Sequence, residues 1–185
     1  GGTAVEVLYL LEDIRVPVLD KLMLLITALG EETAFLILAL VLFWCVNKYQ
    51  GYYILSVGFI GTIANQFMKL WFRIPRPWVL DENFTILEQA REGASGYSFP
   101  SGHTQNFATW STLIALKIKK LSVWILTAVL IILVAFSRMF LGAHYPMDVI
   151  AGALLGVLFA IIGNSVYDKA EDKNRLFLWS VVIFT

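Results

Sequence analysis

The sequence has little charge, one cysteine and two histidines. Of its 185 residues, 15% are charged and 58% are hydrophobic, and Lys plus Arg equal Asp plus Glu at 14 each. A soluble domain carries about 25% charged and about 45–50% apolar residues. The high apolar content excludes a disordered chain, and the lack of a basic stripe argues against a nucleic-acid-binding protein. The single cysteine, Cys45, excludes an intrachain disulfide.

Long apolar runs are the dominant feature, and the mean hydropathy is +0.73. A membrane-crossing helix needs about 20 mostly apolar residues. Residues 4–29 form two amphipathic segments, broken at Val16-Pro17, that we expect to lie in the membrane interface. We predict an all-α, polytopic transmembrane bundle of about six helices, with spans at 32–47, 51–72, 102–118, 121–141 and 146–167 and a truncated last helix at 176–185.

We expect residues 1–185 to form a single membrane domain. The chain opens on Gly1-Gly2-Thr3 and stops within an apolar run, which indicates a piece of a longer protein. Gly152 and Gly156 have the small-xxx-small spacing that lets helices approach closely in lipid. We interpret this spacing as packing within the bundle rather than as a dimer interface, and the sequence does not indicate an oligomeric state.

Ionisable residues at membrane depth are costly and therefore point to function. Counting crossings places the polar groups of four separate stretches on one membrane face: the ends of the second and fourth spans, and the starts of the third and fifth. Both histidines of the chain belong to this cluster. Its candidate site residues are Lys69, Arg76, Ser101, Gly102, His103, Arg138, His144 and Asp148.

The cations and the helix start in this cluster suit a phosphate ester. Three cations, Lys69, Arg76 and Arg138, would offset the charge of an oxyanion. The start of the third span, residues 101–103, would present free backbone N–H groups and the positive end of a helix dipole.

The two histidines suit nucleophilic catalysis. Asp148 follows His144 by one helical turn, so its carboxylate can hold one imidazole nitrogen while the other attacks. His103 can then supply a proton to the leaving group.

These residues form three motifs: K-x6-RP from Lys69 to Pro77, P-S-G-H at 100–103, and S-R-x5-H-x3-D at 137–148. In this order they resemble the three signature motifs of the type 2 phosphatidic acid phosphatase superfamily. The resemblance extends over residues 69–148, and the flanking spans fit the family's six-helix membrane core.

The resemblance implies metal-independent hydrolysis through a phosphohistidine intermediate, with no cofactor. By this analogy His144 is the nucleophile, Asp148 orients it, and His103 is the general acid. The phosphoryl group would be bound by the remaining five residues: Lys69, Arg76, Ser101, Gly102 and Arg138.

Taken singly, the residues have simpler interpretations. Lys69 and Arg76 could anchor a span at the interface, Ser101 could be a helix N-cap, and His144 with Asp148 could be a structural pair. Their joint occurrence favours a functional site. Outside the cluster, four amides could support the site or join helices by hydrogen bonds: Asn65, Gln66, Gln105 and Asn106. The loop 81–99 could contain a short helix and act as a lid or as a solvated connector.

Other functions fit parts of this pattern. A lipid phosphotransferase of the same superfamily would share the phosphohistidine step. An intramembrane serine protease using Ser101 would lack a Gly-x-Ser-x-Gly elbow and would leave the cations unexplained. An anion-binding module would bind phosphate without turnover. The hydropathy argues against the superfamily's soluble haloperoxidase branch.

We therefore expect a membrane lipid phosphatase whose partners are its lipid phosphate substrate and membrane lipids. Phosphatidylglycerophosphate, phosphatidic acid and undecaprenyl diphosphate all suit the cation cluster. When Lys69, Arg76 and Arg138 are set aside as site residues, Lys and Arg are more frequent on the opposite face, which makes that face cytoplasmic. The site then faces outward, in what we expect to be a bacterial cytoplasmic membrane.

Overall fold

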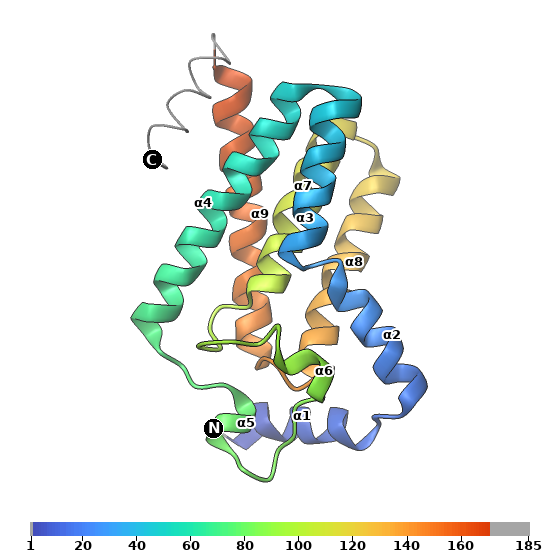
Figure 1. Ribbon diagram of the computed structural model, residues 1–185, viewed down its shortest axis with the longest axis vertical. Coiled ribbons are helices and arrows are strands. Elements are labelled where there is room, and N and C mark those ends of the chain that lie inside the picture. Colours follow the sequence, from blue (N-terminus) through green and yellow to red (C-terminus); the bar gives the residue numbers. More distant parts are fainter. Residues whose placement is uncertain (1, 171–185) are drawn as a thin grey trace.

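The computed structural model describes residues 2–170, and this part of the chain is helical without strands (Figure 1). The sixth span expected at 176–185 lies outside the described residues. The elements are α1 (Gly2–Asp13), α2 (Pro17–Ala28), α3 (Glu32–Val41), the π-helical turn η1 (Leu42–Val46), α4 (Lys48–Phe72), α5 (Pro77–Leu80), α6 (Glu88–Arg91), α7 (Gly102–Ile118), α8 (Leu121–Phe140) and α9 (Pro146–Lys169).

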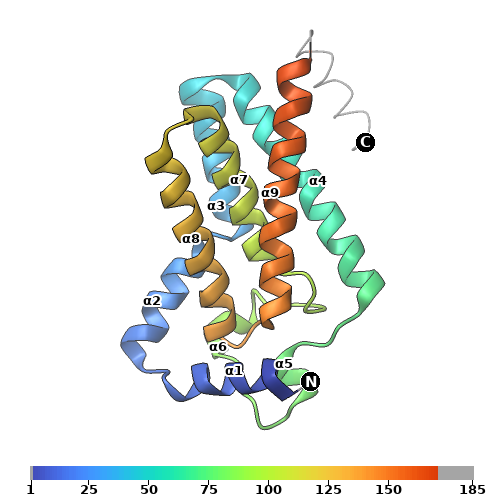
Figure 2. The ribbon, with the colours of Figure 1, turned by 180° about the vertical axis from the view of Figure 1, so that it is seen from behind.

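The long helices α3, α4, α7, α8 and α9 form a bundle, and α1 lies across one end of it (Figures 1 and 2). Helix α7 packs against α3, α4, α8 and α9. Its buried side chains include threonine, serine and glutamine as well as apolar residues. Because α7 is surrounded by protein, its weak hydropathy does not prevent it from lying inside a membrane bundle.

Close packing of α7 and α9 depends on two glycines. A Cβ atom at Gly152 would lie 2.5 Å from the carbonyl oxygen of Ser101, and one at Gly156 would come as close to the carbonyl oxygen of Gln105. Only glycine leaves room for these backbones to meet. The small-xxx-small spacing therefore serves packing within the chain, as predicted.

Two helices of the described part, α8 and α9, are by themselves long and apolar enough to cross a membrane. Helices α2 and α3 with η1 reach that length and composition together, with a bend of 48° at their junction. Large apolar side chains point outward on α8 and α9, for example Leu121 at 75%, Ile132 at 66% and Leu154 at 67% exposure. Such a belt on helices of this length requires lipid as its solvent.

The N-terminal segments separate where the sequence predicts. Pro17 occupies the first turn of α2, where its missing N–H costs nothing. Side chains of α1 and of the residues that follow it hold this helix at the end of the bundle. The Tyr9 hydroxyl donates to Asp81 at 2.8 Å, Glu12 accepts from the Thr85 N–H at 3.1 Å, and Arg15 Nε donates to the carbonyl of Phe140 at 2.9 Å. The position of α1 across the bundle end is the one expected for an interfacial helix.

Candidate active site

The candidate site lies at the end of the bundle where α4 and α8 finish and α7 and α9 begin (Figure 1). A cavity of about 360 Å³ opens there. Five of the predicted site residues line it: Lys69, Arg76, Gly102, His103 and His144. The other three, Ser101, Arg138 and Asp148, are buried and lie outside the cavity lining.

His144 lies in the turn between α8 and α9 and is 1% exposed. Its Nδ1 is 3.4 Å from Oδ2 of Asp148, within ion-pair distance but without the alignment of a hydrogen bond. On the other edge of the ring, Nε2 is 3.3 Å from Nη1 of Arg76. The imidazole is thus held between a carboxylate and a guanidinium.

Asp148 joins three segments of the site. Its Oδ2 accepts hydrogen bonds from the Tyr145 backbone N–H at 2.8 Å and from the Ser98 hydroxyl. Its backbone carbonyl accepts from the N–H of Ser101 at 2.9 Å. Asp148 therefore closes the first turn of α9 and fixes the start of α7 beside it. Ser98 gave no signal in the sequence, because an isolated serine in a loop has no distinguishing pattern.

The guanidinium of Arg76 is fixed by backbone carbonyls. Nε donates to Gly96 at 2.9 Å, Nη2 donates to Ser95 at 2.7 Å, and Nη1 donates to Ala143 at 3.0 Å. Burial lowers the pKa of Arg76 to about 10, which still leaves it cationic near neutral pH. The side chain is a fixed positive charge next to His144.

Lys69 is held by the same loop. Arg73, with φ of 50°, ends α4 in the left-handed conformation and turns the chain away from the helix axis. Nζ of Lys69, one turn earlier, donates to the carbonyl of Tyr97 at 2.6 Å. Consecutive loop carbonyls at 95–97 thus position both cations. The loop contains the expected short helix, α6, and it takes part in building the site.

Arg138 is 1% exposed near the end of α8. Its Nη1 donates to the hydroxyl of Thr27, in the last turn of α2, at 2.9 Å. Its Nε and Nη2 have no hydrogen-bond partner in residues 2–170. Two nitrogens of a buried guanidinium therefore have unused N–H donors. Thr27 was not found from the sequence, because its contact partner is distant in the chain.

Ser101 caps α7. Its Oγ accepts from the Thr104 N–H at 3.4 Å and lies 3.0 Å from the Thr104 hydroxyl. The simpler interpretation of Ser101 as an N-cap is thus correct, and its binding to phosphate stays a prediction. Gly102 and His103, which follow it, line the cavity, so the positive end of the α7 dipole faces that space.

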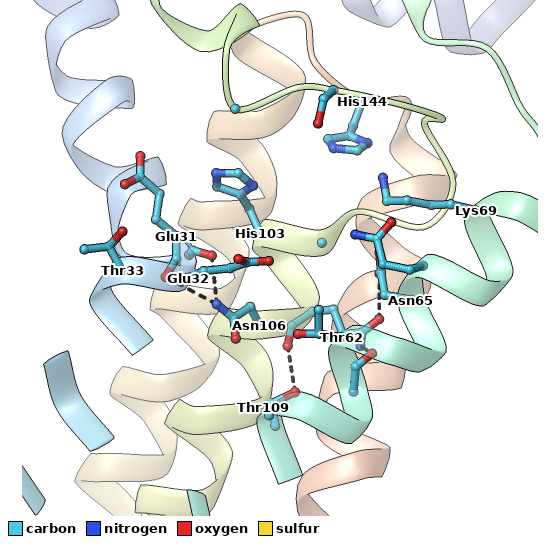
Figure 3. A pocket seen from close by; sticks show the side chains of 18 of the residues that line it. Glu31, Glu32, Thr33, Thr62, Asn65, Lys69, His103, Asn106, Thr109 and His144 are labelled. Carbon is cyan, nitrogen blue, oxygen red and sulfur yellow. Dashed lines mark hydrogen bonds between the residues drawn. The ribbon is translucent and has the colours of Figure 1, made fainter. Parts of the chain in front are cut away.

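The junction of α2 and α3 packs directly on His103. A Cβ atom at Gly30 would lie 2.6 Å from the His103 carbonyl oxygen. Nδ2 of Asn106 donates to the carbonyls of Gly30 at 3.2 Å and Glu31 at 3.3 Å, as Figure 3 shows. The amide at position 106 therefore joins α7 to the junction of α2 and α3.

Asn65 and Gln105 join α4 to α7. Nδ2 of Asn65 donates to Oε1 of Gln105 at 2.8 Å, and Nε2 of Gln105 donates to the Gly61 carbonyl at 2.7 Å. Such interhelical bonds satisfy polar groups where water is scarce. They hold the two helices that carry Lys69 and His103.

The charges around His144 keep its imidazole neutral. Burial lowers the pKa of His144 well below 6.5, and the cations Arg76, Arg138 and Lys69 lower it further. A neutral imidazole has a lone pair available for attack. The arrangement can therefore bind an oxyanion and attack it.

The fold and site together define a membrane helix bundle with a buried, cationic, histidine-containing site at one end. A family model described as PAP2 superfamily matches residues 48–172. The chain belongs to the PAP2 superfamily, and it is a phosphoric ester hydrolase, a membrane phosphatase of the PAP2 type.

Named relatives and a solved structure agree with this assignment. The chain is 32% identical to phosphatidylglycerophosphatase B of Bacillus subtilis, over 85% of this chain and 80% of the relative. It is 30% identical to an undecaprenyl-diphosphatase of Sulfolobus acidocaldarius, over 94% and 82%. The crystal structure of a transmembrane PAP2-type phosphatidylglycerolphosphate phosphatase from Bacillus subtilis superposes with a TM-score of 0.76 at 28% identity, covering 91% of this chain and 86% of that one.

Proposed function

We propose that this protein hydrolyses a lipid phosphomonoester or diphosphate, without a metal ion, through a phosphohistidine on His144. The observation that carries the proposal is the position of His144 between Asp148, at 3.4 Å, and Arg76, at 3.3 Å. An Arg76 N–H directed at Nε2 requires that nitrogen to be unprotonated, so the ring proton is on Nδ1, facing the carboxylate. This tautomer leaves Nε2 as the nucleophile.

In the first step, Nε2 of His144 attacks phosphorus and the bond to the leaving oxygen breaks. His103, which takes up a proton when the anionic substrate binds beside it, gives this proton to that oxygen. The lipid therefore leaves as an alcohol or, from a diphosphate, as a monophosphate. In the second step, water attacks the phosphohistidine, His103 takes the proton from this water, and inorganic phosphate leaves.

The buried cations stabilise charge on the phosphoryl oxygens. Lys69 and Arg76 line the cavity, and two nitrogens of the buried Arg138 lack a partner among the described residues. Donors that are already fixed in place need no reorganisation when the transition state forms. We propose that the free backbone N–H groups at the start of α7 add to this binding and that the site faces the outer leaflet of a bacterial membrane, where lipid tails stay in hydrocarbon.

Phosphate release from phosphatidic acid, phosphatidylglycerophosphate and undecaprenyl diphosphate tests the proposal. The purified protein in detergent with excess EDTA should release phosphate from at least one of these lipids. His144→Gln should lose activity by a factor of at least about 10³, as expected when a covalent nucleophile is removed. Full activity of this variant would refute the nucleophile, and strict dependence on added metal would refute the mechanism.

A further inference from the structure

The cavity is larger than a phosphoryl group needs. Its volume is about 360 Å³, whereas a water molecule takes about 30 Å³ in the liquid. The cavity therefore has room for the first atoms of the leaving group as well as for the phosphoryl group. The charges that line this further space decide which leaving groups fit.

Among the side chains that line the cavity, the cations lie near His144 and the carboxylates lie in a different part. The cationic side chains in its lining, Lys69 and Arg76, are fixed on loop carbonyls next to His144. Glu31 and Glu32 also line the cavity, and both are exposed to it and to solvent. In Figure 3 Glu31 lies on the opposite side of His103 from His144 and Lys69.

The backbone that carries these carboxylates is fixed relative to His103. The backbone of Gly30 contacts the backbone of His103, and Asn106 holds the carbonyls of Gly30 and Glu31. Since His103 is the proposed proton donor, the leaving oxygen faces it. The group attached to that oxygen then meets Glu31 and Glu32.

We propose that Glu31 and Glu32 make this enzyme selective for phosphomonoesters over diphosphates; this inference rests on the function proposed above. In a monoester the leaving oxygen is attached to carbon. In a diphosphate it is attached to a second phosphorus, whose negative oxygens would lie beside the two carboxylates. Thr33, which lies beside Glu31 in Figure 3, also lines the cavity, is uncharged and can bind hydroxyl or ester oxygens.

Phosphatidic acid and diacylglycerol diphosphate form a matched pair of substrates, because they share one lipid and differ by one phosphate. The ratio of their initial kcat/KM values, measured in EDTA, isolates the effect of the second phosphate from any change in phosphoryl binding. The wild-type ratio should favour phosphatidic acid. Each of Glu31→Gln and Glu32→Gln should shift it about threefold toward the diphosphate, and the double variant about tenfold, in line with partly screened charges.

The matched control is Glu6→Gln with Glu82→Gln, which removes two exposed carboxylates that lie outside the cavity lining. This control should leave the ratio unchanged. A wild-type preference for the diphosphate, or a ratio that the Glu31 and Glu32 variants do not move, would overturn the inference while leaving the proposed function intact. Loss of phosphate release from every substrate by the wild-type protein would instead overturn the proposed function.

Discussion

Nη1 of Arg76 lies 3.3 Å from Nε2 of His144, and the same nitrogen donates to the carbonyl of Ala143 at 3.0 Å. One nitrogen of Arg76 thus contacts the ring nitrogen that would attack, and it also holds the turn that carries His144. Since an incoming phosphoryl group must reach the same nitrogen, Arg76 would meet its oxygens there. The relationship makes Arg76 both a ligand and a support for the nucleophile.

Replacing Arg76 by lysine tests this double role. Lysine keeps the charge but cannot make the planar set of bonds to Ser95, Gly96 and Ala143. Arg76→Lys should lower kcat/KM by about 100-fold, the value of two or so charge-assisted hydrogen bonds. Arg73→Lys is the matched control, because Arg73 is exposed and its Nε donates only to the Leu70 carbonyl among the described bonds. Equal activity of the two variants would contradict the role of Arg76.

Thr27 should act on phosphate binding through Arg138. Its hydroxyl is the described partner of that guanidinium, at 2.9 Å. Thr27→Val keeps the shape and removes the acceptor, so KM should rise several-fold, whereas Thr27→Ser should restore the wild-type value. Thr112→Val is the control, because the buried Thr112 hydroxyl has no hydrogen-bond partner in the described chain. A normal KM in Thr27→Val would show that Arg138 needs no such positioning.

Gly30 should control the position of His103. An alanine methyl at Gly30 would lie 2.6 Å from the His103 carbonyl oxygen, so the start of α7 and the α2–α3 junction must move relative to each other. If His103 protonates the leaving oxygen, Gly30→Ala should slow the hydrolysis of alkyl phosphates more than that of p-nitrophenyl phosphate. An alkoxide leaving group needs a proton, whereas p-nitrophenolate does not. An equal loss on both substrates would indicate a purely structural role.

The pKa of His144 can be measured directly, because the chain has only two histidines. Its imidazole should titrate well below pH 6.5 in ¹⁵N NMR spectra, owing to burial and the neighbouring cations. Arg76→Gln removes one of these positive charges and should raise the pKa of His144. Lys117→Gln, at the other end of α7, should not. A titration near 6.5 in the wild-type protein would contradict the described environment.

The same shift predicts the pH dependence of stability. Between pH 6.5 and the lower pKa of folded His144, the unfolded chain takes up a proton that the folded protein excludes. His144 therefore lowers the free energy of unfolding as the pH falls below 6.5. The thermal midpoint of His144→Gln should fall less steeply than that of the wild-type protein between pH 7 and pH 5. Parallel curves would contradict the prediction.

The helices were largely predictable because apolar runs and polar breaks alternate along the chain. The expected spans at 102–118 and 121–141 correspond closely to α7 and α8. The π-helical turn η1 was not predicted, since its residues continue the apolar run of α3. The relation of α2 to α3 was also missed, because a 48° bend between two apolar segments depends on the packing of α2 against α8 and of α3 against α4 and α7.

The candidate site was predictable where side chains carry the chemistry and not where backbone groups do. Buried charges and histidines at recurring spacings pointed to one membrane face, and the structure brings Arg76, His144 and Asp148 together there. The carbonyls that fix Lys69 and Arg76 belong to residues 95–97, whose side chains give no such signal. The positions of these carbonyls depend on the backbone conformation of the loop in the folded protein.

Trapping of the phosphoenzyme tests the central claim most directly. The protein is mixed with ³²P-labelled phosphatidic acid, quenched in alkali, where phosphohistidine survives, and mapped by peptide mass spectrometry. The label should be on His144 and should be absent from His144→Gln. With labelled p-nitrophenyl phosphate as the substrate, the label should persist longer in His103→Gln, because hydrolysis of the phosphohistidine then lacks the base that takes the proton from water. Label on Ser101, or turnover with His144→Gln, would contradict the account.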